Sequence, residues 1–336
     1  MRHKEEIIKI KQIFTNINLQ IKNFKLYEII GGKNNRGFKV INNGLTYFAK
    51  FYFHDEQRNK SRIETELNFF NFIKNKKIKN IPKPINFSTD HNIGIFEFIE
   101  GKSFTNKNQI NEDCVKQAAD FFSKINGNVS LNAPMNNASD AEYSLKGNFS
   151  LIENRIEKLK EIKIKHDIDI EAKNLVVELS NLWNSEKIKI NSEFIKNKFN
   201  DLDKDQRCIS PSDFGFHNAL IDENQIVYFL DFEHAGFDDP AKFICDFFLQ
   251  PKIAVSMKYF DYFTRRSLIN FSNKESIIKR SLIMFPLFKV KWVCILLNEF
   301  LENNLKRRIF SKSLENIEKQ KALQLGKAKK LFSELT

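Results

Sequence analysis

The sequence predicts an α+β protein in which a small N-terminal antiparallel sheet with one helix joins a large, mainly helical C-terminal part. Three observations lead to this fold class. Turns rich in glycine and asparagine separate short aromatic-rich segments between residues 26 and 53, which is typical of hairpins. After residue 101 the apolar residues recur at helical spacing. A short β-rich segment, 207–233, interrupts those helices. We therefore expect an N-terminal lobe over 1–100 and a C-terminal lobe over 101–336.

The composition indicates a globular chain and argues against several other classes. Of the 336 residues, 42% are hydrophobic and 29% charged. No apolar run reaches the roughly 18 residues that span a bilayer, so we expect no membrane partner. The four cysteines lie far apart without a C-x-x-C pair, which favours a reducing, cytoplasmic location. The net charge of +12 comes from lysines mixed with glutamates along the whole chain, so we expect no nucleic-acid partner.

The N-terminal elements follow one another in a clear order. Residues 1–23 have helical periodicity, and L-Y-E-I-I then begins a strand. G-G-K-N-N-R-G forms a turn before the strand F-K-V-I, and N-N-G closes a hairpin with a third strand over 45–53. Ile63, Leu67 and Phe70 keep helical spacing until I-P-K-P-I breaks it. Two short strands follow, of which the second is G-I-F-E-F-I, and the lobes join near 97–101.

The C-terminal part is predicted to be helical apart from two segments. Residues 127–149 have the composition of a loop or a covering insertion, and 207–233 reads as a β-rich island. The expected helices are 111–126, 150–164, 170–184, 188–199, several from about 241 onward, and a charged last helix over 312–334.

The stretch S-P-S-D-F-G-F-H-N, residues 210–218, allows two interpretations. It contains D-F-G, the tripeptide with which protein kinases hold magnesium. It also places Asn218 five residues after Asp213, which is the spacing of the catalytic loop of those enzymes. One aspartate does not fill both roles. The residues that follow favour the catalytic loop, because a turn and the strand I-V-Y-F-L lead back to a second aspartate, Asp231.

This hairpin predicts different roles for the two aspartates. Asn218 and Asp231 would share a magnesium ion, which prefers carboxylate and amide oxygens. Asp213 would face an acceptor hydroxyl and take or orient its proton. The D-F-E sequence ending at Glu233 then replaces D-F-G as the metal motif. Taken alone, an aspartate and an asparagine five apart in a turn are common.

The N-terminal lobe supplies the other parts that phosphoryl transfer requires. Lys50 ends a strand, and Glu66 follows in a helix, so the pair would hold the lysine against nucleotide phosphates. Glu64 is a rival partner, but the helical phase favours Glu66. Gly31 and Gly32, with Asn35 in the same turn, would lie over the phosphates because glycine allows close backbone approach.

The ordered set of motifs resembles the aminoglycoside phosphotransferase and choline kinase family, which has the protein-kinase-like two-lobe fold. The set is G-G-K-N-N-R-G, F-A-K, R-I-E-T-E, E-F-I-E-G, D-F-G-F-H-N and L-D-F-E-H-A-G-F-D-D-P, and it spans residues 26–246. The resemblance implies ATP between the lobes, with its adenine against the backbone of Glu97 to Ile99, and Mg²⁺. One departure is Pro211, which stands where the family usually carries a histidine.

The resemblance also implies a small-molecule acceptor with a free hydroxyl, held by the helical lobe. Glu233 and Asp238 follow the metal strand, and with Asp239 they predict an acidic rim for an ammonium group. The alternative for Asp239 and Asp246 is that they cap or brace helices, and His217 is expected to pack its loop. Two other functions stay open, a protein kinase and a nucleotide-binding pseudokinase without transfer activity. No A-P-E follows D-F-E, which argues against the protein kinase.

Overall fold

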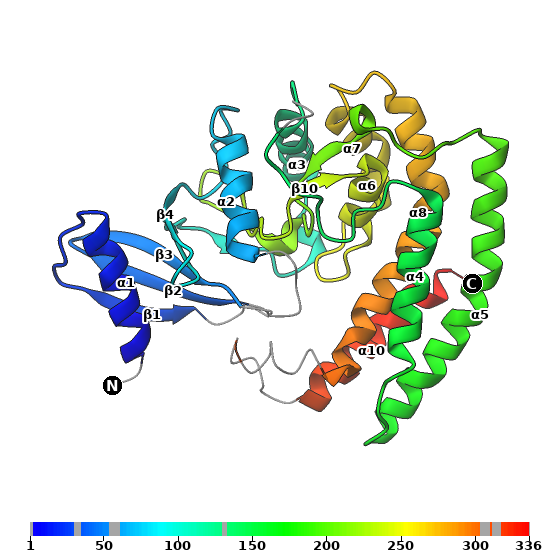
Figure 1. Ribbon diagram of the computed structural model, residues 1–336, viewed down its shortest axis with the longest axis horizontal. Coiled ribbons are helices and arrows are strands. Elements are labelled where there is room, and N and C mark those ends of the chain that lie inside the picture. The colour runs from blue at the N-terminus through cyan, green and yellow to red at the C-terminus, as the bar shows by residue number, and fades with distance from the viewer. Residues whose placement is uncertain are drawn as a thin grey trace.

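A five-stranded antiparallel sheet forms the N-terminal end of the computed structural model, at the left in Figure 1. The structure describes residues 3–29, 35–53, 61–129, 133–302, 310 and 317–335. The strand order is β1-β2-β3-β5-β4, so the predicted hairpins are neighbours in the sheet. The strands are β1 (Lys25–Ile29), β2 (Arg36–Asn42), β3 (Leu45–Phe51), β4 (Pro84–Ser88) and β5 (Ile93–Glu97).

Helix α1 (Lys4–Asn16) covers one face of this sheet. Its Ile10, Ile13 and Phe14 are buried in one apolar cluster with side chains of β2, β3 and β5. The helix is shorter than the predicted 1–23, because the chain turns at Asn18, whose φ of 58° is left-handed.

Helix α2 (Arg62–Ile73) connects the sheet to the helical part of the molecule. Ser61 caps it, since its side chain accepts a hydrogen bond from the Glu64 amide. Phe69 of α2 packs on Phe232 with ring centroids 4.5 Å apart, and Phe232 in turn packs on Phe121 of helix α3 (Glu112–Ile125) at 5.9 Å. One apolar cluster therefore runs from α2 into the C-terminal part.

The C-terminal part is helical, and the predicted fold class is confirmed. Two predicted helices, 170–184 and 188–199, are one helix, α5, which lies at the right edge of Figure 1. No glycine or proline separates them, and Trp183, Glu186 and Ile190 continue the buried stripe across the expected break. The helices are α3 (Glu112–Ile125), α4 (Leu145–Leu159), α5 (Asp167–Lys196), α6 (Pro240–Leu249), α7 (Phe260–Ser267), α8 (Lys274–Leu297) and α10 (Ile317–Ser333).

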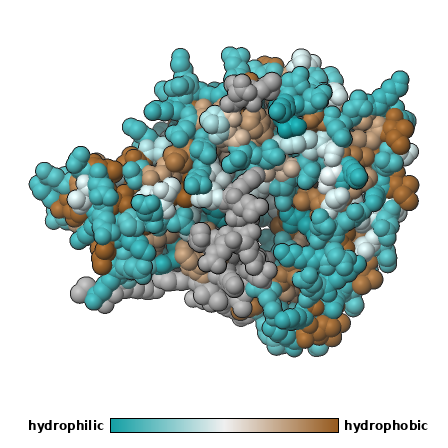
Figure 2. Space-filling view, viewed as in Figure 1, coloured by the Kyte–Doolittle hydropathy of each residue, from teal (hydrophilic) through white to brown (hydrophobic). Residues whose placement is uncertain are grey.

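Helix α8 passes through the centre of the helical part and contacts α4, α5, α6 and α10. Among the described residues, the segment Lys274–Phe300 is long and apolar enough to cross a membrane by length and composition alone. Its buried residues include the charged Arg280 and Lys291, each of which meets an aspartate of the helical part, as in a core helix. On the face shown in Figure 2, hydrophilic side chains predominate and hydrophobic ones are scattered.

Short strands hold the β-rich island together. β6 (Lys102–Ser103), β8 (Ala219–Ile221) and β9 (Val227–Phe229) form one sheet, and β7 (Cys208–Ser210) pairs with β10 (Gly236–Asp238). Single 3₁₀ turns span Lys107–Gln109, Lys204–Gln206, Phe216–Asn218, Met257–Tyr259 and Asn298–Phe300.

Part of the predicted insertion 127–149 lies against β10. The amide of Ala138 donates to the Phe237 carbonyl at 2.8 Å, and the Phe237 amide donates to the Asn136 carbonyl at 2.9 Å. Glycine is needed at position 236, because a Cβ there would lie 2.2 Å from the Asn136 oxygen. The loop is thereby held beside the segment that follows D-F-E.

Candidate active site

Lys50 and Glu66 meet between the sheet and helix α2. The Nζ atom of Lys50 lies 2.6 Å from Glu66 Oε2 and 2.6 Å from Asp231 Oδ1. The rival Glu64 is exposed on α2, and the described ion pairs of Lys50 go instead to Glu66, Asp231 and Glu233. Burial lowers the pKa of Lys50, but the nearby carboxylates of Asp231, Glu66 and Glu233 outweigh it and raise that pKa well above its usual range. Lys50 is therefore a fixed positive charge.

Glu66 also fixes the backbone of the D-F-E segment. Its Oε1 accepts a hydrogen bond from the Phe232 amide at 3.0 Å, while Tyr52 donates to its Oε2 at 2.7 Å. Asp231, one residue earlier, has a left-handed φ of 68°. Non-glycine residues seldom adopt this conformation, and it is found at functional sites where the surroundings impose it. Helix α2 thus determines where the Asp231 carboxylate points.

Asp213 lies in a second tight turn, and its side chain is exposed. Its Oδ1 is 3.0 Å from His217 Nε2, and its Oδ2 accepts from Asn218 Nδ2 at 3.2 Å. The surrounding protein removes part of the water around this carboxylate, which raises the pKa of Asp213, but His217 and the Asn218 amide together lower it below the ordinary value of an aspartate. The carboxylate is therefore ionised at neutral pH. His217, expected only to pack its loop, contacts this carboxylate directly.

The turn before Asp213 is braced without a histidine at position 211. Pro211 fills that position and is buried. Ser210 accepts a hydrogen bond from the Ser212 amide at 2.9 Å, and Ser212 has a left-handed φ of 56°. A short hydrogen-bonded turn therefore orients Asp213.

Asn218 and Asp231 lie side by side, as the hairpin predicts. Strands β8 and β9 pair, and the Leu230 amide donates to the Asn218 carbonyl at 2.9 Å. Because Asn218 uses Nδ2 for Asp213, its amide oxygen remains available to a ligand.

The charge around Asp231 suits a divalent cation. In the described part of the chain, the carboxylates of Glu66, Asp231 and Glu233 are paired with the side chains of Lys50 and Arg62, and His234 lies 3.5 Å from Glu233. Burial, with the other two carboxylates, outweighs Lys50 and raises the pKa of Asp231 to about 7. The carboxylate of Asp231 and the amide oxygen of Asn218 thus fit Mg²⁺. No cluster of three or more His, Cys, Asp or Glu suited to a metal occurs in the described ranges.

The prediction of an acidic rim is wrong for Asp238 and Asp239. The environment of Glu233 also differs from the predicted one. Asp238 is fully buried, with its carboxylate 2.7 Å from Lys242 Nζ, and burial raises its pKa to about 6. Asp239 is fully buried as well, where it caps α6 and pairs with Arg280, as its alternative interpretation proposed. These carboxylates follow the strand but turn into the core, because their cationic partners lie there. Glu233 is buried and paired, although it does border the cavity described below.

Besides Lys50 and Glu66, three groups of residues were predicted to contact the nucleotide. Glu97 ends β5, and Ile99 lies in the connection to the C-terminal part. Asn35 begins the described part of the glycine-rich turn and donates to Glu233 Oε2 at 2.5 Å. Gly31 and Gly32 lie outside the described residues.

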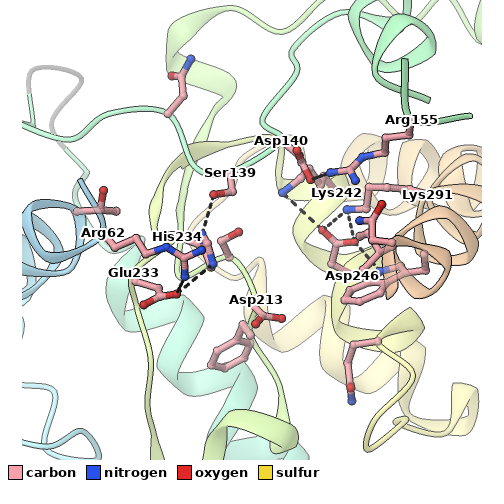
Figure 3. Close-up of a pocket in the computed structure, with 18 residues that line it drawn as sticks. Arg62, Ser139, Asp140, Arg155, Asp213, Glu233, His234, Lys242, Asp246 and Lys291 are labelled. Carbon is pink, nitrogen blue, oxygen red and sulfur yellow. Dashed lines mark hydrogen bonds and ion pairs between the residues drawn. The ribbon is translucent and has the colours of Figure 1, made fainter. Parts of the chain in front are cut away.

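A cavity of about 620 Å³ opens beside Asp213. In Figure 3, Arg62, Glu233 and His234 form a group on one side of it. A second group lies across from them, with Asp213 between the two, and consists of Asp140, Arg155, Lys242, Asp246 and Lys291.

Most of the cavity wall was not anticipated. Asp246 of α6 accepts hydrogen bonds from Lys291 Nζ, at 2.5 and 2.7 Å, and from Trp292 Nε1, at 2.9 Å. Asp140 comes from the loop bound to β10 and pairs with Arg155 of α4. One available signal was the four-residue spacing of Lys242 and Asp246, which puts both on one face of a helix. No local pattern brings in Asp140 or Trp292.

Comparison with known proteins gives the fold a clear set of relatives. No family model and no curated protein sequence matches the chain. Solved structures do match: an ethanolamine kinase of Plasmodium vivax, at 16% identity and a TM-score of 0.59, covers 95% of this chain and 91% of its own. The choline kinase LicA of Streptococcus pneumoniae has 16% identity and a TM-score of 0.57, with 99% of each chain covered. The ADP-bound aminoglycoside phosphotransferase APH(2'')-Ib has 17% identity and a TM-score of 0.56, covering 96% of this chain and 98% of its own. The chain therefore has the fold of these small-molecule kinases.

Proposed function

We propose that the protein transfers a phosphoryl group from ATP, with Mg²⁺, to a hydroxyl of a small molecule. The observation that carries this proposal is the placement of Asp213. Its exposed carboxylate borders the cavity, while Asn218, which it contacts, leads to the Lys50–Asp231 cluster. An acceptor in the cavity and a nucleotide at the cluster would thus meet at one point.

Each residue has a separate part in this proposal. Asp213, kept ionised by His217, accepts or orients the proton of the acceptor hydroxyl. Lys50, held by Glu66, contacts the nucleotide phosphates. Asn218 and Asp231 would hold Mg²⁺, which would neutralise charge on those phosphates. The backbone of Glu97 to Ile99 would border the adenine, and the glycine-rich turn would cover the phosphates.

Asp231→Ala and Asn218→Ala should each weaken nucleotide binding that depends on magnesium. Asp231→Ala removes the only carboxylate that this proposal gives to the ion, so we expect the larger loss there. Nucleotide titrations with Mg²⁺ and with EDTA measure the effect, and both variants should keep the binding seen in EDTA. Unchanged magnesium dependence in both variants would mean that the ion is held elsewhere.

The cavity favours an acceptor that carries an amino group. The side chains of Asp140 and Asp246 are 31% and 18% exposed, whereas those of Lys242 and Lys291 are only 2% and 3% exposed. The Asp246 carboxylate therefore faces the cavity with its lysine partners behind it, while Asp140 faces the cavity beside its own partner Arg155, which is 21% exposed. Trp292 is also in the wall, and tryptophan is the side chain whose ring attracts cations most strongly.

A transfer screen with matched acceptors tests this class. Each amino alcohol or amino sugar is assayed beside its hydroxyl analogue, and we expect turnover with the amino member of a pair. Asp246→Asn should raise the KM for the amino acceptor about tenfold or more, since a charged hydrogen bond is worth about 1.5–3 kcal/mol. The KM for ATP should stay unchanged. Turnover confined to neutral or acidic sugars would exclude the amino class but keep the kinase.

The two other functions are distinguished by the same assay. A protein kinase is disfavoured because α6 begins at Pro240, six residues after His234, where an activation loop would run. A pseudokinase would bind nucleotide without any transfer.

We also propose a cytoplasmic location for the protein, since all four cysteines are buried and free.

A further inference from the structure

Arg62 is the first residue of α2. Of the three nitrogens of its guanidinium group, one is hydrogen-bonded to a described residue. Its relative exposure is 4%, and its Nη1 donates to the Glu233 carboxylate. The Nε and Nη2 atoms are also buried, and neither has a hydrogen-bond partner among the described residues. Buried guanidinium groups without partners are costly, because the protein does not replace the lost water. These two donors therefore indicate a ligand that the protein itself does not supply.

The position of Arg62 indicates which ligand this is. Arg62 borders the cavity together with Asp213 and Glu233, and in Figure 3 it extends toward Glu233 and His234. This is where the acceptor side of the site meets the Lys50–Asp231 cluster, because Lys50 lies 3.5 Å from the same Glu233 carboxylate. A planar guanidinium with two adjacent free donors matches two oxygens of a phosphoryl group.

We propose that Arg62 binds the terminal phosphoryl group of the nucleotide and stays on it during transfer. This inference rests on the proposed function and adds a catalytic residue to it. Nη1 holds the guanidinium on Glu233, while Nε and Nη2 face the oxygens of the phosphoryl group. Charge spreads over those oxygens in the transition state, so a fixed cation there lowers the barrier.

A purely structural role for Arg62 is the competing explanation. In that case the arginine would serve only to neutralise Glu233. Glu233 already has other partners, since Asn35 donates to it at 2.5 Å and Lys50 and His234 both lie 3.5 Å away. Neutralising Glu233 also leaves the two free donors of Arg62 unexplained.

The test compares two nucleotides that differ in the terminal group. Mg²⁺-ADP and the Mg²⁺ complex of the non-hydrolysable β,γ-imido analogue of ATP are titrated into the wild type, Arg62→Lys and Arg62→Met. We expect both variants to lose about tenfold or more in affinity for the triphosphate and less than twofold for ADP. Arg62→Lys keeps a charge near Glu233, so it preserves the fold if Arg62→Met does not. Arg266→Met, which removes an arginine paired with Asp120 away from the cavity, is the control and should change neither affinity.

The possible results separate the two proposals. Equal losses for both nucleotides, or no loss for either, would show that Arg62 is structural and overturn its role while the proposed function stands. A wild-type protein that binds neither nucleotide would overturn the proposed function, and the role of Arg62 with it. Once an acceptor is known, kcat in Arg62→Lys should fall about 10²- to 10³-fold, the usual effect of losing one donor to a charged transition state.

Discussion

Asp213→Asn is expected to reduce phosphoryl transfer by about 10²- to 10⁴-fold, the usual contribution of a positioned general base. The replacement has the same shape and can still accept from Asn218 through its amide oxygen, so the turn should keep its structure. It lacks the negative charge that receives a proton from the acceptor hydroxyl. Because Asp213 faces the cavity and not the Lys50–Asp231 cluster, Mg²⁺-ATP affinity should change by less than about twofold.

Single-turnover transfer and nucleotide titration together measure this prediction. Asp261→Asn is a suitable control, because it replaces an exposed aspartate on α7, away from the cavity. If Asp213→Asn instead abolished Mg²⁺-dependent nucleotide binding and Asp231→Ala did not, the two aspartates would have exchanged roles. The literal D-F-G would then be the metal motif after all.

The N-terminal part was predictable from the sequence because its signals are local. N-N-G fixes the β2–β3 hairpin, where Asn42 pairs with Leu45, and aromatic strands define the rest of the sheet. In α5 the local signal failed, since S-E-K is polar enough to suggest a break although it contains no helix breaker. There the neighbouring helices decide, because Glu186 is buried between the apolar Trp183 and Ile190.

The residues of the candidate site also fall into two groups, those that sequence motifs predict and those that only the fold brings in. Lys50, Glu66, Asp213, Asn218 and Asp231 come from motifs whose order along the chain predicts their meeting. The residues of the acceptor wall do not come from such motifs, because Asp140 reaches the cavity only through the bonds between its loop and β10. Asp238 shows the converse, since its place after the metal strand suggested exposure and only its contact with Lys242 shows that it faces the core.

Asp239→Ala should cause the largest loss of stability, about 3–5 kcal/mol in the free energy of unfolding. Asp239 is fully buried, and its Oδ1 accepts from the Ala241 amide at 2.7 Å to cap α6. Its Oδ2 accepts from Arg280 Nε at 3.1 Å and lies 3.0 Å from Nη2. Removing the carboxylate leaves the buried guanidinium of Arg280 without its counter-charge, which accounts for most of the loss, and the missing cap adds about 1 kcal/mol.

Two variants separate the ion pair from the cap in urea denaturation. Asp239→Asn keeps an oxygen for the Ala241 amide but not the charge, so it should retain about 1 kcal/mol more stability than Asp239→Ala. Asp261→Asn breaks a pair between aspartate and arginine in which the side chains are 74% and 50% exposed, and it should cost less than about 1 kcal/mol. Equal urea midpoints for Asp239→Ala and Asp261→Asn would mean that Arg280 finds another partner or water. In that case the pair of Asp239 and Arg280 would contribute little to holding α6, which carries Asp246 into the cavity and is also tied by the pairs of Lys242 with Asp238 and of Asp246 with Lys291.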